Sequence, residues 1–286
     1  MSKKVIISTD STADLSAELI EKYGIKVSPL FVTMDDKNYL DGVDIKVEDL
    51  FNYTSSTGKL AKTAAQSSAY FFDYFKSLTA DGSAVIHFSV SGSMSSSFNF
   101  ANLAAMENDN VYVVDSENLS TGIGLLVLKA AELAESGIGA EEIYNKICAA
   151  RCRVDSSFVI DTLEYLHKGG RCSTVAMLGA NVLKLKPCIE VTDGAMTVGK
   201  KYRGKIESVF KEYVRDRLAD IDNIELDRIF VTSTCGDSPV VNEICELVKS
   251  IADFKEVLVT QAGCTIAAHC GPGTLGILYM RKTPKV

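Results

Sequence analysis

The most informative absence in this sequence is that of a long apolar run. No stretch approaches the roughly 20 apolar residues that a membrane-spanning helix needs, and the N-terminal Met-Ser-Lys-Lys turns polar too soon for a signal peptide. Basic runs are also absent, and the formal net charge is −7, which argues against a nucleic-acid-binding surface. These absences predict a cytoplasmic protein with no stable membrane anchor and no nucleic-acid partner.

Patterns typical of metal sites and disulfides are missing as well. The eight cysteines form no Cys-x-x-Cys pair, and no histidine stands at ligand spacing from them. In a reducing compartment, scattered cysteines behave mostly as small apolar residues. We therefore expect no zinc site, no disulfide and no metal or organic cofactor.

In the first half of the chain, strand patterns alternate with helix patterns. Strands are expected at Val5–Thr9, Val27–Met34, Ala84–Phe88 and Val111–Val114, and helices at Leu15–Tyr23, Val47–Tyr53, Ala69–Leu78, Thr121–Glu135 and Ala140–Cys152. Such alternation indicates an α/β fold with a largely parallel sheet and helices on both faces. Gly122 and Gly124, in the first turn of their helix, would suit close backbone approach or weak capping.

The pattern restarts after a soft boundary near residues 151–156, and 286 residues are enough for two domains. The expected elements are strands at Ser157–Ile160, Ile229–Ser233 and Val257–Gln261, helices at Asp161–Lys168, Val175–Leu185, Ile206–Leu218 and Val240–Ile251, and a hairpin of Cys188–Val191 and Met196–Val198 around Asp193-Gly194. We predict an N-terminal α/β domain at 1–155 and a second α/β domain at 156–286.

A serine-rich turn links the strand at Ala84–Phe88 to the helix that follows it. Six serines crowd this turn, at 89, 91, 93, 95, 96 and 97. Unpaired amides and the positive end of the dipole at a helix N-terminus favour an anion, and hydroxyls add donors beside them. An acyl or phosphate head group could therefore bind here, although a helix cap with surplus surface serines explains the same pattern.

Other candidate site residues are scattered along the chain, each with a structural alternative. Asp10–Thr12 follow the first strand and should face the ligand crevice of a doubly wound sheet. Thr63 carries a hydroxyl on an expected loop ahead of a helix, where it could simply be a turn residue. Arg171, after Gly169-Gly170, could pair with an anion or bond carbonyls of its own turn. His269 precedes a Gly-Pro-Gly corner and could contact a ligand or be a structural histidine.

One compact basic segment stands out in this acidic protein. Lys200-Lys-Tyr-Arg-Gly-Lys205 contains four cationic side chains, among them Arg203. Such a patch is usually a solvated face, but it also suits an acidic partner or a phosphate group.

Taken together, these segments resemble the DegV family, which includes the fatty-acid-binding subunit of bacterial fatty acid kinase. The resemblance covers nearly the whole chain and is carried by Ser8–Leu15, the serine turn at 89–97, Val113–Ser116, Asp161–Leu166, Lys168–Arg171, Lys186-Pro187, Arg203-Gly204 and His269–Gly273. It implies a two-domain α/β protein that holds one long-chain fatty acid, such as palmitate, stearate or oleate, in a closed tunnel between its domains.

The resemblance also implies roles for individual residues. Thr63, Ser95, Ser91 and His269 match positions that hold the fatty acid carboxylate, and Arg171 matches the arginine after the family's double glycine. The sequence departs from the family pattern at Ala64-Ala65 and Ser67, and at Ser96-Ser97-Phe98 in the serine turn. These departures keep the hydroxyl positions while altering the loops that carry them.

We therefore expect a non-enzymatic carrier that buries a fatty acid and presents its carboxylate to a separate kinase subunit, related to dihydroxyacetone kinases, which forms the acyl phosphate. Arg203 is the expected docking residue for that partner. About 0.8 kcal/mol per buried methylene would make long chains bind better than short ones.

Two enzymatic alternatives use the same serine turn. A serine hydrolase would take Ser91 or Ser95 as nucleophile and His269 as base, but the segment Ser89–Ser93 has serine at both glycine positions of the Gly-x-Ser-x-Gly elbow. A phosphoryl-transfer enzyme would need a phosphate-binding glycine loop or a magnesium-binding carboxylate cluster, and the sequence contains neither motif.

Overall fold

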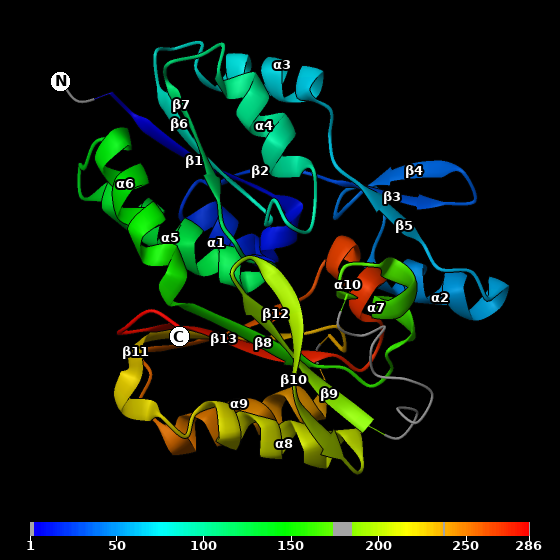
Figure 1. The fold of residues 1–286 in the computed structure, drawn as a ribbon. Helices are drawn as coiled ribbons and strands as arrows, with labels where there is room; N and C mark the ends of the chain where they lie inside the picture. Colours follow the sequence, from blue (N-terminus) through cyan, green and yellow to red (C-terminus); the bar gives the residue numbers. More distant parts are fainter. Residues whose placement is uncertain (1–2, 174–184, 237, 286) are drawn as a thin grey trace.

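A parallel sheet forms the centre of the N-terminal half of the computed structural model, which describes residues 3–173, 185–236 and 238–285. Its strands are β1 (Val5–Asp10), β2 (Lys26–Ser28), β6 (Ala84–Ser89) and β7 (Val111–Asp115), in the order β2-β1-β6-β7. All three strand pairings are parallel. The predicted parallel α/β sheet is confirmed (Figure 1).

Helices cover both faces of this sheet, because its apolar strands must be buried on both sides. One face carries α3 (Ser68–Leu78) and α4 (Ser97–Ala105), and the other carries α5 (Thr121–Glu135) and α6 (Ala140–Ala150), while the short α1 (Ala17–Lys22) follows β1. α5 is buried along most of its length because it also packs against the sheet of the second domain.

The second domain contains a mixed six-stranded sheet. Its strands are β8 (Val154–Val159), β9 (Leu185–Thr192), β10 (Ala195–Arg203), β11 (Ile224–Ser233), β12 (Glu256–Gln261) and β13 (Leu275–Arg281), in the order β10-β9-β8-β13-β11-β12. Only β11 and β12 pair in parallel. Helices α8 (Ile206–Arg217) and α9 (Pro239–Ile251) cover the face of this sheet that points away from the first domain (Figure 1).

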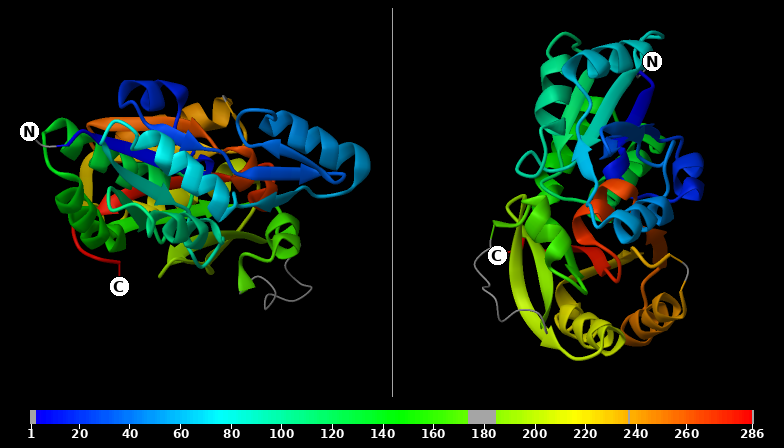
Figure 2. Two further views of the ribbon diagram at one scale, coloured as in Figure 1. Left: turned by 90° about the horizontal axis from the view of Figure 1, so that it is seen from above. Right: turned by 90° about the vertical axis from the view of Figure 1, so that its right-hand side faces the viewer.

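A third, smaller layer lies beside the junction of the two domains. It consists of β3 (Phe31–Met34), β4 (Lys37–Leu40) and β5 (Lys62–Ala64), which form an antiparallel sheet, together with α2 (Val47–Thr57) and α10 (Cys264–Cys270). The helix α7 (Glu164–Gly169) packs on α10. In the right-hand view of Figure 2, the domains lie one above the other with α10 between them.

The structure of this part of the chain corrects several predictions of secondary structure. The expected strand Val27–Met34 is two strands in different sheets, because the chain leaves the first sheet at Pro29, which has no amide to donate to it. Residues 54–57, expected in a loop, extend α2 up to Gly58, which ends the helix with φ 70°. Thr63, also expected in a loop, lies in β5, paired with β3.

Of the remaining predictions, one hairpin is confirmed, one helix lies largely outside the described residues and the domain division is not tested. The hairpin turns at Asp193-Gly194, where both residues have positive φ, as a tight hairpin turn requires. Residues 175–184 of one expected helix lie outside the described residues, and Leu185 begins β9. The domain division at residue 155 stays a prediction, and it falls within β8, a strand of the second sheet.

Gly122 shows why small residues begin α5. A Cβ atom at this position would lie 2.2 Å from Asn118 Oδ1 and 2.3 Å from Ser156 Oγ. Gly122→Ala should therefore lower the free energy of unfolding by roughly 1–3 kcal/mol through overpacking, measured by urea denaturation. Gly139→Ala is the control, because no atom lies within 4 Å of that position. Equal stability of the two variants would contradict this packing argument.

Candidate functional site

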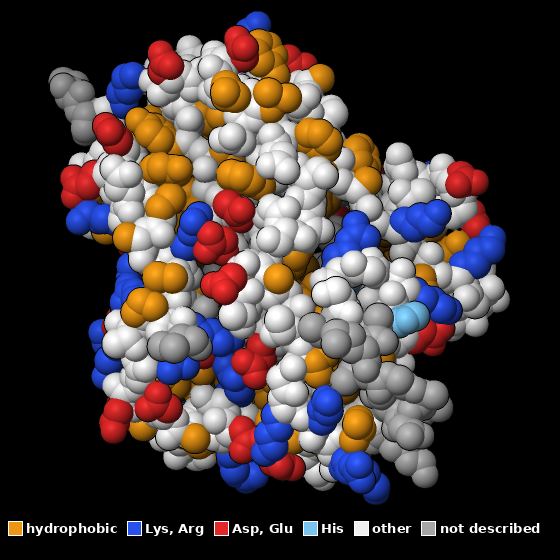
Figure 3. Space-filling view, in the orientation of Figure 1, with side chains coloured by type: hydrophobic (Ala, Val, Ile, Leu, Met, Phe, Trp, Pro, Cys, Tyr) orange, Lys and Arg blue, Asp and Glu red, His pale blue; other side chains and the backbone are white. Residues whose placement is uncertain are grey.

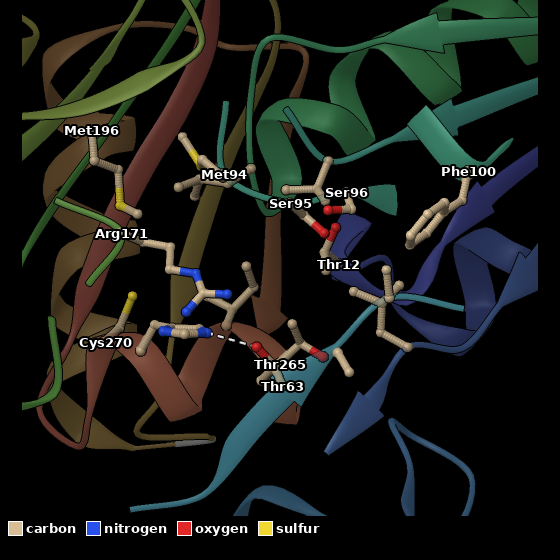
Figure 4. Close-up of a pocket in the computed structure, with 17 residues that line it drawn as sticks. Thr12, Thr63, Met94, Ser95, Ser96, Phe100, Arg171, Met196, Thr265 and Cys270 are labelled. Atoms are coloured by element: carbon tan, nitrogen blue, oxygen red, sulfur yellow. Dashed lines mark hydrogen bonds between the residues drawn. The ribbon is translucent and has the colours of Figure 1, made fainter. Parts of the chain in front are cut away.

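A cavity of about 330 Å³ lies between the two domains. The residues that line it come from both halves of the chain: Thr12, Leu30, Thr63, Ala64, Ala65, Val90, Met94, Ser95, Ser96, Phe100, Leu119, Arg171, Met196, Thr265, Ile266, His269 and Cys270. Figure 4 shows the polar side chains in two groups, with Thr12, Ser95 and Ser96 on one side and Arg171, Thr63 and Thr265 on the other. The remaining wall is largely apolar.

The serine turn is held in place by carboxylates from the two strands that flank β6. Asp10, at the end of β1, accepts the amide of Val90 at 2.9 Å and both the amide and hydroxyl of Thr12. Asp115, at the end of β7, accepts the amide of Gly92 at 3.2 Å. Because Asp10 is fully buried, desolvation raises the pKa of its carboxyl group. These bonds fix the positions of the serine turn and of Thr12, which supply the polar groups on this side of the cavity.

The hydroxyls of the turn have different partners. Ser95 Oγ accepts the amide of Ser97 at 3.2 Å, which leaves its own proton free for another acceptor. Ser91 Oγ instead donates to the carbonyl of Gly194 at 2.6 Å, in the hairpin of the second domain. Ser91 is buried and is not among the described residues lining the cavity. Its hydroxyl joins the two domains.

On the opposite wall, Thr63 and His269 form a direct pair. The distance from Thr63 Oγ1 to His269 Nε2 is 2.8 Å, although the residues are 206 positions apart in sequence (Figure 4). Thr63 is supplied by β5 and His269 by the last turn of α10. The sequence analysis expected His269 at a turn and did not predict α10, because a helix of seven residues offers too little periodicity to detect.

The N-terminus of α10 is anchored by two carboxylates from the first part of the chain. Asp14 accepts the amide of Gly263 at 2.8 Å, and Asp41 accepts those of Cys264 at 2.8 Å and Thr265 at 3.1 Å. Burial raises the pKa of Asp14 well above its usual value. These bonds satisfy amides that have no partner within the helix, and they set the position of His269 relative to Thr63.

His269 is uncharged near neutral pH. Burial lowers the pKa of its imidazole to about 4, and the positive charge of Arg171 contributes to this shift. Nδ1 is buried, has no hydrogen-bond partner in the described part of the chain and lies against Gly169. The tautomer with its proton on Nε2 avoids a buried, unpaired N–H at Nδ1. In that tautomer the ring donates to Thr63 Oγ1, and the threonine proton is free to bond an anion in the cavity.

Arg171 carries the only formal charge among the described lining residues. Its Nη1 donates to the carbonyl of Gly169 at 2.8 Å, so it holds its own turn as well as facing the cavity. The bond to a carbonyl of its own turn is therefore confirmed, and pairing with an anion stays a prediction. No ion pair joins Arg171 to another described residue, so its charge is available to an anion.

The structure thus brings together Thr63, Ser95, His269 and Arg171 and places Ser91 outside the cavity wall. It also places Thr12 in the wall, as the crevice argument expected. Thr265 was not predicted from the sequence, because its signal, a hydroxyl one helical turn before His269, depends on knowing that α10 exists. Arg203 is exposed at the end of β10 and does not line the cavity.

The residues that the structure describes do not form a hydrolytic triad. His269 Nε2 bonds Thr63, while Ser91 bonds a carbonyl and Ser95 bonds an amide. A serine nucleophile needs its base within hydrogen-bonding reach.

Among the described residues, no group of three His, Cys, Asp or Glu side chains could hold a metal ion, and no helix is long and apolar enough to cross a membrane.

Comparison with known proteins identifies the family. Residues 4–282 match the family model described as "Uncharacterised protein, DegV family". A DegV domain-containing protein of Clostridium perfringens is 34% identical over 284 residues, which cover 98% of this chain and 99% of that protein. The chain belongs to the DegV family.

Solved structures of DegV proteins have the same two-domain α/β fold. A fatty-acid-binding DegV protein from Thermus thermophilus superposes with a TM-score of 0.90 at 28% identity, covering 97% of this chain and 99% of that one. A stearic-acid-binding protein from Eubacterium ventriosum has a TM-score of 0.83 at 28% identity, with 98% of both chains covered. The fatty-acid-binding DegV protein of Bacillus subtilis has a TM-score of 0.84 at 26% identity, covering 98% and 100% of the two chains.

The lowered pKa of His269 predicts acid sensitivity. Between pH 6.5 and 4 the unfolded chain takes up a proton at this histidine, whereas the folded protein, with a pKa of about 4, does not. Stability should therefore fall as the pH falls through this window, by up to roughly 3 kcal/mol from this group. His87, whose pKa burial lowers to about 3, adds to the loss.

Urea denaturation of lipid-free protein from pH 7.5 to 4 measures this effect. The difference in free energy of unfolding between wild type and His269→Gln isolates the contribution of His269, because all other titrating groups are shared. Wild type should lose more stability on acidification than the variant. Parallel pH profiles would show that His269 is not the source.

Proposed function

We propose that this protein binds one long-chain fatty acid in the cavity between its domains and acts as a carrier rather than an enzyme. The observation that carries the proposal is the Thr63–His269 pair, which presents a hydroxyl proton to a largely apolar cavity beside Arg171, a side chain that forms no ion pair with a described residue. This arrangement suits a ligand with one anionic end and a long apolar tail. We propose a cytoplasmic location for this role, as the sequence analysis expects.

The polar groups satisfy the requirements of a buried carboxylate. Such a group is costly to bury unless donors and a countercharge surround it. Thr63 and Ser95 offer free hydroxyl protons, and Arg171 offers the charge, since His269 is neutral and acts through Thr63. We assign the carboxylate to the space between these side chains.

The rest of the wall suits an alkyl chain. Leu30, Val90, Met94, Leu119 and Met196 line the cavity, and each buried methylene of a ligand contributes about 0.8 kcal/mol. The volume of about 330 Å³ lies within the range of small-molecule sites, about 300–1,000 Å³. The fatty-acid-binding relatives from Thermus thermophilus and Eubacterium ventriosum support the same ligand class for this chain.

The direct test is extraction of the purified protein with organic solvent and identification of the released molecule by mass spectrometry. We expect a long-chain fatty acid at close to one per protein chain. Thr63→Val should lower the occupancy and weaken oleate binding by roughly 10- to 100-fold, because a hydroxyl that bonds a charged group contributes about 1.5–3 kcal/mol.

Thr33→Val is the matched control, since Thr33 lies on the neighbouring strand β3, bonds Asn38 and does not line the cavity. It should bind oleate like wild type. An empty extract, together with no binding of added oleate or palmitate, would overturn the proposed function.

We further propose that the carrier presents its ligand to a fatty acid kinase and that Arg203 contributes to docking. Figure 3 shows basic and acidic side chains mixed over the lower part of the molecule, where β10 and α8 lie. Lys200 is paired with Asp216 at 2.6 Å and with Glu212 at 3.3 Å. Arg203 is exposed and forms no ion pair with a described residue, so its charge is available to an acidic partner.

Charge reversal tests this docking role. Arg203→Glu should reduce kinase-dependent formation of acyl phosphate at least about tenfold, since repulsion replaces attraction across the interface, while oleate binding stays unchanged. Arg215 is an exposed arginine on α8. Arg215→Glu makes the same change of charge at another position and should leave kinase-dependent formation of acyl phosphate unchanged. Equal coupling of the two variants would refute a role for Arg203.

A further inference from the structure

The hydroxyl of Thr265 has no hydrogen-bond partner among the residues that the structure describes, although Thr265 is only 6% exposed. A buried polar group without a hydrogen bond destabilises the fold by about 1–3 kcal/mol, so such groups need an explanation. Among the described residues, two that line the cavity have such an atom, and these are Thr265 and His269, both on α10. The Nδ1 of His269 packs on Gly169, which leaves Thr265 as the unexplained donor.

The backbone of Thr265 is fixed from the other side. Its amide donates to Asp41 Oδ2 at 3.1 Å, and the amide of Cys264 donates to Oδ1 of the same carboxylate at 2.8 Å. Residues four apart on a helix lie on the same face, so Thr265 and His269 present their side chains together. Figure 4 shows Thr265 beside Thr63 in the cavity wall.

We propose that Thr265 Oγ1 donates a hydrogen bond to the carboxylate of the bound fatty acid, as a binding residue additional to Thr63 and Ser95. This inference rests on the proposed function. A carboxylate only accepts hydrogen bonds, and its two oxygens provide about four acceptor sites. The free proton of Thr63 and the guanidinium of Arg171 occupy some of these sites, and Thr265 supplies a donor from α10 for another.

This role predicts a distinctive combination of effects for Thr265→Val, which replaces the hydroxyl by a methyl group of similar size. Affinity for oleate should fall roughly 10- to 100-fold, because a bond to a charged acceptor is lost. The thermal stability of the lipid-free protein should stay the same or rise, because an unpaired buried hydroxyl has been removed. A purely structural threonine would show a loss of stability instead.

Three comparisons give the experiment its specificity. Thr265→Ser keeps the hydroxyl and should keep most of the affinity. Thr9→Val is the matched control, because Thr9 Oγ1 is also buried without a partner but lies in β1, outside the cavity wall. Methyl oleate has no charge, so its hydrogen bond to Thr265 would be weaker. Thr265→Val should therefore lower the affinity for methyl oleate by less than about threefold.

Each outcome of calorimetric titration with oleate is decisive. If wild type and Thr265→Val bind oleate equally, Thr265 is not a ligand residue and the carrier function stands. If Thr265→Ser loses as much affinity as Thr265→Val, the methyl group matters rather than the hydroxyl, which also overturns the proposal. If wild type binds neither oleate nor methyl oleate, the proposed function fails together with this inference.

Discussion

Hydrogen bonds from backbone amides to four aspartates, three of them buried, hold this site together. Asp10 and Asp115 bind the amides of the serine turn, and Asp14 and Asp41 bind those at the start of α10. A carboxylate can bond several amides at once, and a bond to a charged acceptor is about twice as strong as a neutral one. Asp14 follows β1 of the parallel sheet, whereas Asp41 follows β4 of the small antiparallel sheet, so these bonds tie α10 to both.

This arrangement separates the structural charges from those that meet the ligand. The four aspartates are directed at backbone amides, and none of them lines the cavity. Within the wall, Arg171 supplies a positive charge and His269 stays neutral because it is buried. A ligand carboxylate therefore meets hydroxyl protons and one cation, with no acidic side chain among the described lining residues to repel it.

Further contacts join the two halves of the molecule. Ser91 bonds the carbonyl of Gly194, Thr121 and Thr232 bond each other at 2.6 Å, and Arg228 of β11 pairs with Glu132 of α5 at 2.7 Å. The serine turn therefore has two tasks. Ser95 faces the cavity, whereas Ser91 fixes the position of the second domain, and the two hydroxyls are only four residues apart.

Much of the fold could be predicted from the sequence, because long elements carry a strong periodic signal. β1, β6, β7 and α5 bury apolar residues in regular patterns, and these patterns predicted the parallel sheet and its helices. Short elements were missed or misplaced. β5 has three residues and α10 has seven, too few for periodicity to distinguish them from loops. Tertiary contacts stabilise both, since β5 pairs with β3 and α10 packs on α2 and β3.

The sequence by itself determined the α/β class, the hydroxyl-rich turn at the end of β6 and, through its resemblance to the DegV family, most of the candidate residues. Only the tertiary structure decided how those residues are used. It pairs Thr63 with His269 across 206 positions, turns Ser91 toward Gly194, and places Thr265 in the cavity wall. The physical reason is that the direction and protonation of a side chain depend on burial and on partners from distant segments, which no local pattern encodes.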